Sequence, residues 1–344
     1  MSDQPSTFAF AYAMPLPWQQ SAWSQIEQAW KAGRMPHALL LHGVEGLGKF
    51  ELAKWLAKAL LCEVNSGSMS ASVLKPCNQC AGCKLFAAGS HPDFVLITPE
   101  EDKQQISVEQ IRIAAEKLSM TSARQGFRVA IIEPAHQLTV AAANALLKTL
   151  EEPGQTTLIV LVTSQRGAML PTIRSRCQQL GIVAPPVNVA QNWLQQNTGK
   201  AVSSDLLGFA KHAPLQVLAC LQGSFESLQR EMNPALTTLN LATDVTQLAQ
   251  AWADERINER LNWLDYWLTR RIRHEILGND DPVTSNVSGT SLQSATQVLN
   301  ISALFHALDK LREIKARLRR TALQKELAME SVLLVVQRAL STAS

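Results

Sequence analysis

The residue spacing with the clearest chemical meaning is a glycine-rich turn that follows the apolar run 37–41. In a phosphate-binding loop, backbone amides and one lysine hold the phosphates of a nucleotide. The residues that fit this spacing are Gly43, Gly46, Gly48 and Lys49. The pattern next requires a serine or threonine hydroxyl that binds Mg²⁺, and this position holds Phe50. The sequence therefore predicts the frame of a nucleotide site that lacks a ligand for its metal.

A second position concerns the attacking water. The apolar run 128–132 ends in Glu133 and Pro134. An ATPase of this layout has a metal-binding aspartate and then a water-activating glutamate at these positions. Proline has no carboxylate, so the pattern predicts an ATPase fold that does not hydrolyse ATP and has no functional ATP and Mg²⁺ site. The alternative is an active ATPase in which Glu133 holds Mg²⁺ through water.

Four cysteines form a second group with meaningful spacing. Cys62 closes the helix predicted after the glycine-rich turn, and a run with two-residue spacers follows, made of Cys77, Cys80 and Cys83. Four thiolates match a tetrahedral structural Zn²⁺ site, which leaves no open position for catalysis. We therefore predict a zinc module at about residues 62–95. An iron–sulfur cluster or free thiols are the alternatives, and His91 is a possible substitute for one ligand.

Two further motifs lie near the end of the predicted sheet. Ser175, Arg176 and Cys177 precede its last strand. A surface arginine is most often solvated, but beside a site that cannot hydrolyse ATP it can serve a neighbouring subunit's site instead. Thr163 and Ser164 end another strand, at the position where a polar sensor usually faces the γ-phosphate, and a simple strand cap is the equal alternative.

Apolar runs alternate with helical patterns over the first half of the chain. The predicted strands are 38–42, 93–97, 128–132, 157–163 and 179–183, and the predicted helices are 23–32, 49–62, 107–119, 139–151 and 167–175. Such alternation predicts an α/β domain with a doubly wound parallel sheet, and strands without polar alternation are typical of sheets buried on both faces. Pro185 and Pro186 indicate a linker. Beyond it only helical patterns follow, including two helices within 301–340 and a polar interruption at 278–291.

Bulk composition sets outer limits on function. A length of 344 residues predicts two or three domains, and 46% apolar with 18% charged residues is typical of a globular protein. A net charge of +3 does not by itself indicate a nucleic-acid partner. No apolar run is long enough to cross a membrane, and the N-terminus lacks a signal-peptide pattern, so we expect a cytoplasmic protein.

In combination these motifs resemble the bacterial clamp-loader family of AAA+ proteins. The resemblance covers about residues 37–183 and rests on the glycine-rich frame, the four cysteines, the segment from Ala141 to Pro153, and the Ser175-Arg176-Cys177 motif. Clamp-loader ATPase subunits keep the metal-binding hydroxyl and the acidic pair, which this chain lacks at Phe50 and Pro134. The chain is therefore more similar to the delta-prime type of subunit of the DNA polymerase III holoenzyme.

This resemblance implies three domains and a set of partners. They are a RecA-like AAA+ domain with a zinc module over 1–183, a small helical lid over 184–225, and an all-α collar over 226–344 that supports oligomerisation. The implied partners are the ATPase subunits (gamma or tau) and a delta subunit, with the sliding clamp and primed DNA reached through the complex. Arg176 matches the arginine finger supplied to the neighbouring ATPase. The remaining alternative is a zinc-dependent nucleic-acid-binding module.

Overall fold

The computed structural model describes residues 12–66, 73–101, 103–120, 122–124, 126–154, 156–222, 225–239, 242–277, 301–318 and 324–341. The predicted polar interruption at 278–291 lies outside these residues. Contacts divide the chain into two compact units, Met1–Ala190 with Ala213–Gln216, and Gln191–His212 with Val217–Ser344. The division into three domains stays a prediction.

The first unit is built around a parallel sheet. Its strands are β1 (Ala38–His42), β2 (Phe94–Ile97), β3 (Arg128–Ile132), β4 (Thr157–Thr163) and β5 (Gln178–Gly181). They form a 5-stranded sheet in the order β2-β3-β4-β1-β5, and every neighbouring pair is parallel. The predicted strands are confirmed, the last one beginning at Gln178 and ending at Gly181. Parallel strands share one carboxyl edge, which brings the segments after β1, β3 and β4 to the same edge of the sheet.

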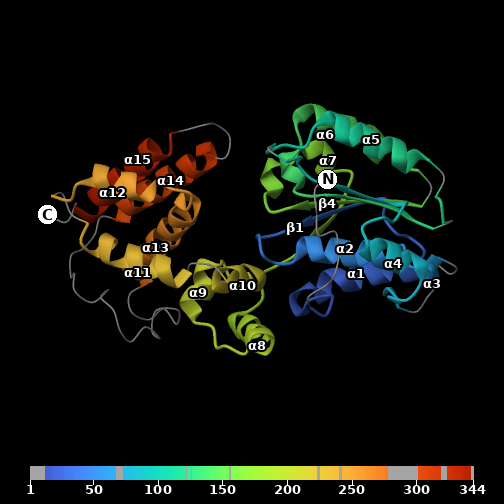
Figure 1. Ribbon diagram of the computed structural model, residues 1–344, viewed down its shortest axis with the longest axis horizontal. Helices are drawn as coiled ribbons and strands as arrows, with labels where there is room; N and C mark the ends of the chain where they lie inside the picture. The colour runs from blue at the N-terminus through green and yellow to red at the C-terminus, as the bar shows by residue number, and fades with distance from the viewer. Residues whose placement is uncertain are drawn as a thin grey trace. The chain divides into compact units, whose positions relative to one another are not determined.

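Helices cover both faces of this sheet (Figure 1). One face carries α1 (Gln20–Lys31), α2 (Lys49–Leu60) and α4 (Ala81–Ala87), and the other carries α5 (Val108–Ser119), α6 (Val140–Glu151) and α7 (Pro171–Arg174). Shorter pieces are η1 (Pro17–Gln19), α3 (Glu63–Ser66), η2 (Ala135–Gln137) and η3 (Arg166–Ala168). Successive strand residues enter opposite cores: Leu39 and Leu41 join the first, Ala38 and Leu40 the second. This double burial explains why the strands read as continuous apolar runs.

Helix boundaries in this unit follow local capping chemistry. The Ser107 hydroxyl accepts a hydrogen bond from the Gln110 backbone N–H at the start of α5, and the Gln110 side-chain oxygen accepts one from the Ser107 backbone N–H. The Thr139 hydroxyl accepts the Ala142 amide at the start of α6. These bonds satisfy amides that have no partner within the helix. The helix α6 ends just before Pro153, as the sequence predicts.

The second unit is helical throughout its described residues. It contains α9 (Ser204–Phe209), α11 (Phe225–Thr237), α12 (Val245–Trp252), α13 (Ile257–Leu277), α14 (Ile301–Leu318) and α15 (Lys325–Ser341). Two further helices, α8 (Val187–Thr198) and α10 (Pro214–Gln222), contribute residues to both units. The helix α14 packs against both α13 and α15, and α12 packs on α15. The expected pair of helices within 301–340 is thus confirmed.

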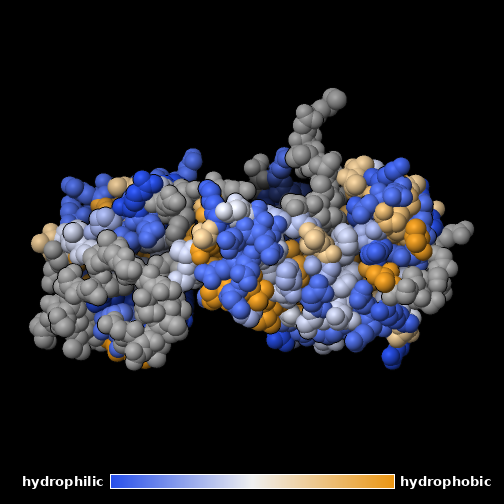
Figure 2. Space-filling model, turned by 90° about the horizontal axis from the view of Figure 1, so that it is seen from below, coloured by the Kyte–Doolittle hydropathy of each residue, from blue (hydrophilic) through white to orange (hydrophobic). Residues whose placement is uncertain are grey.

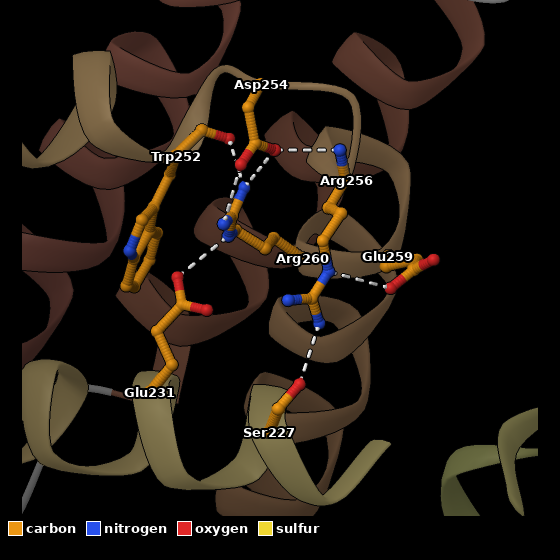
Figure 3. A network of polar contacts seen from close by, with 7 residues as sticks. All are labelled: Ser227, Glu231, Trp252, Asp254, Arg256, Glu259 and Arg260. Carbon is orange, nitrogen blue, oxygen red and sulfur yellow. Dashed lines mark hydrogen bonds and ion pairs between the residues drawn. The ribbon is translucent and has the colours of Figure 1, made fainter. Parts of the chain in front are cut away.

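A buried arginine joins three parts of this helical unit (Figure 3). The side chain of Arg260 on α13 is only 5% exposed. Its guanidinium bonds to the Glu231 carboxylate on α11 at 2.9 Å, to the Asp254 carboxylate at 2.5 and 3.1 Å, and to the Trp252 carbonyl at 3.1 Å. Its neighbour Arg256 is 31% exposed and contacts Glu259. Arg260 therefore fixes the α12–α13 connection against α11.

Hydrophilic residues predominate on the face of the molecule shown in Figure 2, and hydrophobic residues form small separate patches. Exposed apolar side chains include Val140 at 70% and Val183 at 75%. Among the helices that the structure describes, none is long and apolar enough to cross a membrane.

Candidate functional site

The glycine-rich turn connects β1 to α2 at the carboxyl edge of the sheet. Gly46 and Gly48 have φ angles of 78° and 73°, a region that favours glycine. Gly48 is the N-cap of α2, and Lys49 is its first residue. The strand, turn and helix expected from the sequence are therefore present, with Lys49 at the start of α2, and a nucleotide-binding role for this turn stays a prediction.

The lysine of this frame is engaged within the loop itself. Lys49 is 6% exposed, and its Nζ donates a hydrogen bond to the Val44 carbonyl oxygen at 2.7 Å. Burial lowers the pKa of Lys49, although the carboxylates of Glu45 and Glu133 act in the opposite direction. One of the three N–H donors of the Lys49 ammonium is therefore bonded to a backbone carbonyl of the loop.

Two segments distant in sequence also form hydrogen bonds with the loop. The Trp18 indole Nε1 donates to the Leu47 carbonyl at 3.0 Å. The side-chain Nε2 of Gln19 donates to the carbonyls of Leu47 and Gly48 at 2.9 and 2.8 Å. From the other segment, the backbone N–H of Leu215 donates to the Gly46 carbonyl at 3.1 Å. Gln19 is fully buried. The chain thus packs its own residues on the turn, which sequence reasoning missed because these contacts join remote segments.

The two positions that depart from an ATPase lie next to this loop. Phe50 is half-buried against the core beneath α2, and the Lys54 Nζ lies 4.6 Å from the centre of its ring. Burial is the main cause of a raised pKa at Glu133, and the Glu51 carboxylate adds to it while Lys49 opposes it. Pro134 is the N-cap of η2. Neither Phe50 nor Pro134 offers an oxygen ligand to a metal or a base to water.

The candidate sensor residues have different surroundings. Thr163 is 1% exposed, and its hydroxyl accepts the Gln165 amide at 3.0 Å and lies 3.1 Å from His136 Nδ1. Ser164 is exposed. The Thr163 hydroxyl is therefore satisfied within the domain, and its assignment as a sensor stays a prediction. The contact between His136 and Thr163 was not predicted from the sequence. The available signal was that His136 follows Glu133 by three residues, after the end of the neighbouring strand.

Arg176 lies directly after α7 and is exposed. Its Nη1 donates to the Thr172 carbonyl at 3.1 Å, and its Nη2 contacts the Glu151 carboxylate at 2.5 Å. The Ser175 hydroxyl donates to the same Thr172 carbonyl, and Cys177 is buried in the core. The exposed Arg176 side chain therefore lies between Ser175, which bonds to the turn before it, and the buried Cys177.

The four predicted cysteines converge in space. Their sulfur atoms all lie within 4.8 Å of one another. The Cys62 and Cys80 sulfurs are 3.8 Å apart, and those of Cys77 and Cys83 are 4.0 Å apart. Tetrahedral Zn–S bonds of about 2.3 Å require sulfur separations of about 3.8 Å, so the spacing fits a bound Zn²⁺. All four cysteines are free thiols whose sulfurs converge, so the cluster could hold a metal ion.

Hydrogen bonds and burial act in opposite directions on the pKa values of the cluster's thiols. The backbone amides of Gln79 and Cys80 point at the Cys77 sulfur and lower the pKa of Cys77 to about 6. Burial raises the pKa of Cys62, which favours its thiol until a cation shares the site. His91 lies outside the cluster: its Nδ1 accepts the Asp93 amide at 3.1 Å. The four-cysteine set is thus the better ligand group.

Comparison with known proteins agrees with this architecture. A family model described as "DNA polymerase III, delta subunit" matches residues 18–185, and one described as "DNA polymerase III, delta subunit, C terminal" matches residues 227–338. The DNA polymerase III subunit delta' of Pseudomonas aeruginosa is 32% identical over 271 residues, which covers 77% of this chain and 79% of that protein. The chain belongs to the delta-prime family of DNA polymerase III subunits. The family member from Escherichia coli is 34% identical over 250 residues, covering 72% of this chain and 73% of its own length.

The delta-prime family assignment confirms the resemblance inferred from the motifs. A more distant relative is the DNA polymerase III subunit tau of Bacillus subtilis, 35% identical over 161 residues that cover 47% of this chain and 27% of tau. The match spans about half of this chain. The parallel sheet and the helical C-terminal region agree with the predicted AAA+ fold.

Proposed function

We propose that this chain is a non-hydrolysing subunit of a clamp loader that assists ATP-dependent loading of the sliding clamp onto primed DNA. Its partners would be ATPase subunits of the gamma or tau type and a delta subunit, in the cytoplasm. Membership in the delta-prime family supports the assembly, since relatives are subunits of DNA polymerase III.

The observation that carries the proposal is the state of the phosphate-binding loop. The Lys49 ammonium bonds to the Val44 carbonyl, and Phe50 occupies the position of the metal-binding hydroxyl. Productive ATP binding would also need a Mg²⁺ ligand at position 50, and the Phe50 side chain offers none. Even if ATP were bound, hydrolysis would need a carboxylate that orients the attacking water, and the corresponding position holds Pro134. Metal-assisted ATP binding thus lacks a hydroxyl at position 50, and hydrolysis lacks a carboxylate at position 134.

The isolated chain should therefore show no ATP turnover above background. Restoring a hydroxyl with Phe50→Thr should not rescue turnover, because Pro134 still leaves the water without a base. Steady-state phosphate release at saturating Mg²⁺ and ATP measures this directly. A magnesium-dependent rate that disappears in Lys49→Ala would overturn the proposal and favour the active-ATPase alternative.

In the proposed complex, Arg176 would act on the ATP of a neighbouring subunit. A guanidinium beside the γ-phosphate stabilises charge that spreads over the phosphoryl oxygens during transfer, and such fingers accelerate hydrolysis by roughly 10³-fold or more. This chain would contribute to one of several ATP sites, so we expect a several-fold loss of total turnover in Arg176→Ala. The exposure of Arg176, beside a buried Cys177, supports this role.

The test uses a complex reconstituted from ATPase subunits, a delta subunit and this chain. Arg176→Ala should assemble normally but show slower DNA-stimulated ATP hydrolysis and clamp loading. Arg176→Lys should recover little, since an ammonium lacks the planar fork of a guanidinium. Arg174→Ala is the matched control, being two residues away and half-buried. Equal, small effects of Arg174→Ala and Arg176→Ala would show that Arg176 is an ordinary surface charge.

We also propose that the cluster of Cys62, Cys77, Cys80 and Cys83 binds a structural Zn²⁺. The sulfur spacing supports zinc, and four protein ligands leave no position for substrate. The bound ion would have a structural role: it would cross-link the segment between α2 and β2 and would take no part in catalysis.

A further inference from the structure

The C-terminal end of α6 carries an arrangement that is unfavourable for the helix alone. The last turn ends in Glu151, and Glu152 follows as the C-cap. Negative charges at a helix C-terminus face the negative end of the helix dipole and destabilise the last turn. A residue that breaks a local rule in this way needs a compensating contact or a function.

For Glu151 the contact is the candidate finger. Its carboxylate receives the Arg176 Nη2 at 2.5 Å, from a residue 25 positions later in the chain. The side chains are 50% and 37% exposed, so both remain open to solvent and to a partner protein. The pair is the point at which the end of α6 contacts the motif after α7.

Glu151 and Arg176 are each adjacent in the chain to buried residues of the core. Glu151 directly follows Leu150, which is 2% exposed, and Arg176 lies between Ile173 at 0% and Cys177 at 8%. These three apolar side chains belong to one core cluster on the same face of the sheet. The backbone on each side of the ion pair is therefore held in place, and only the two long side chains have freedom to move.

The guanidinium keeps donors for a further ligand. Its contacts with the Glu151 carboxylate and the Thr172 carbonyl use Nη2 and Nη1 once each. An arginine has five N–H donors in a rigid fork, so most of them stay available. Two fixed acceptors thus define the direction of the side chain without consuming its capacity to bind a phosphate.

We propose that Glu151 is a positioning residue for Arg176, which holds the guanidinium extended and oriented before a neighbouring nucleotide site closes on it. This inference rests on the proposed role of Arg176 as a finger. An unpaired arginine loses rotamer freedom when it docks, and part of that cost is met beforehand by the contact with Glu151. Because half-exposed ion pairs are weak, the expected contribution is about two- to fivefold in rate.

The experiment is a double-mutant cycle in the reconstituted complex, with DNA-stimulated kcat for ATP as the readout. Glu151→Ala should slow the one site that Arg176 serves about two- to fivefold, so total kcat should fall by less than in Arg176→Ala, and it should have no effect in the Arg176→Ala background. Glu151→Gln keeps an acceptor oxygen without the charge and should fall between wild type and Glu151→Ala. Glu152→Ala is the matched control, an exposed glutamate next in the chain. Complex formation, measured by mass, should be unchanged in all variants.

The outcomes separate the inference from the proposed function. If Arg176→Ala is as active as wild type, the finger itself is wrong. If Arg176→Ala is slow but Glu151→Ala matches wild type or Glu152→Ala, only the positioning role is wrong. An effect of Glu151→Ala that persists in the Arg176→Ala background would also overturn it, since it would indicate loss of the α6 end rather than loss of arginine orientation.

Discussion

Replacement of the buried arginine in the helical unit should measurably destabilise that unit. Arg260→Ala removes a guanidinium that is 5% exposed and bonds to Glu231, Asp254 and the Trp252 carbonyl (Figure 3). These contacts connect α11, the α12–α13 turn and α13. Without these contacts, the α12–α13 turn would no longer be held against α11.

The exposure of the partners sets the size of the effect. Removing one member of a fully buried ion pair costs about 3–5 kcal/mol, because the other charge stays buried and unpaired. Here the Glu231 and Asp254 side chains are 32% and 50% exposed, so water replaces much of what they lose. The remaining loss is the Trp252 hydrogen bond and the packing of the arginine stem. We therefore expect a destabilisation of about 2–3 kcal/mol, or roughly 4–12 °C in Tm for a unit of this size.

Thermal unfolding of the full chain, followed by circular dichroism, measures this shift. Arg256→Ala is the matched control from the same network, since its side chain is 31% exposed and should cost less than about 1 kcal/mol. Arg260→Met should recover part of the loss, because it restores the apolar stem without the charge. If Arg256→Ala and Arg260→Ala shifted Tm equally, burial would not be what makes Arg260 important.

The same network predicts a pH dependence. Hydrogen bonds from Arg260 and from the Arg256 amide lower the pKa of Asp254 below its ordinary value of 3.8. A lowered folded-state pKa gives stability that is present above the ordinary value and is lost as the pH falls through the lowered one. The Tm difference between wild type and Arg260→Ala should therefore be full at neutral pH and shrink below pH 3.8. A difference that grows on acidification would contradict the assigned pairing.

Two further predictions concern the first unit. Cys80→Ser should lower zinc content, measured by atomic absorption, and make residues 62–95 more sensitive to proteolysis, whereas Cys177→Ser, outside the cluster, should retain full zinc; full occupancy in both variants would exclude this ligand set. Gly48→Ala should cost about 1–2 kcal/mol even without nucleotide, because φ is +73° and an added Cβ would lie 2.7 Å from Leu16 Cδ1. Gly167→Ala, where nothing lies within 4 Å, is its control, and equal Tm values for the two variants would contradict the strain argument.

The elements of the first unit were predictable because local signals and burial agree there. The run 157–163 is apolar at nearly every position, and the structure buries all of it between two helical layers. The predicted strand at 179–183 runs two residues past β5, which ends at Gly181: the Ile182 amide still donates to the His42 carbonyl at 2.8 Å, and Val183 is 75% exposed. Apolar character alone therefore does not place the end of a strand.

The cysteine cluster was predictable for a different reason. Short spacers bring Cys77, Cys80 and Cys83 together through local geometry alone, and the fourth cysteine, just after α2, was the nearest remaining thiol. The contacts of Gln19 with the loop and of Glu151 with Arg176 were not predictable from spacing, because tertiary packing alone brings these partners together. Polar residues in an irregular segment or at a helix end give no warning of such a partner.

The glycines of the loop have a structural reason to be present even where no phosphate is bound. An added Cβ at Gly43 would lie 2.2 Å from the Ile182 carbonyl oxygen, and one at Gly46 would lie 2.7 Å from the backbone nitrogen of Gln216. At Gly48 it would meet Gln19 as well as Leu16. The backbone atoms this close to Gly43 and Gly46 leave no room for a side chain, whereas at Gly48 the close atoms are the ends of side chains and the positive φ is what favours glycine. A glycine-rich frame is therefore evidence of ancestry and fold, whereas the residues at 50 and 134 carry the information about catalysis.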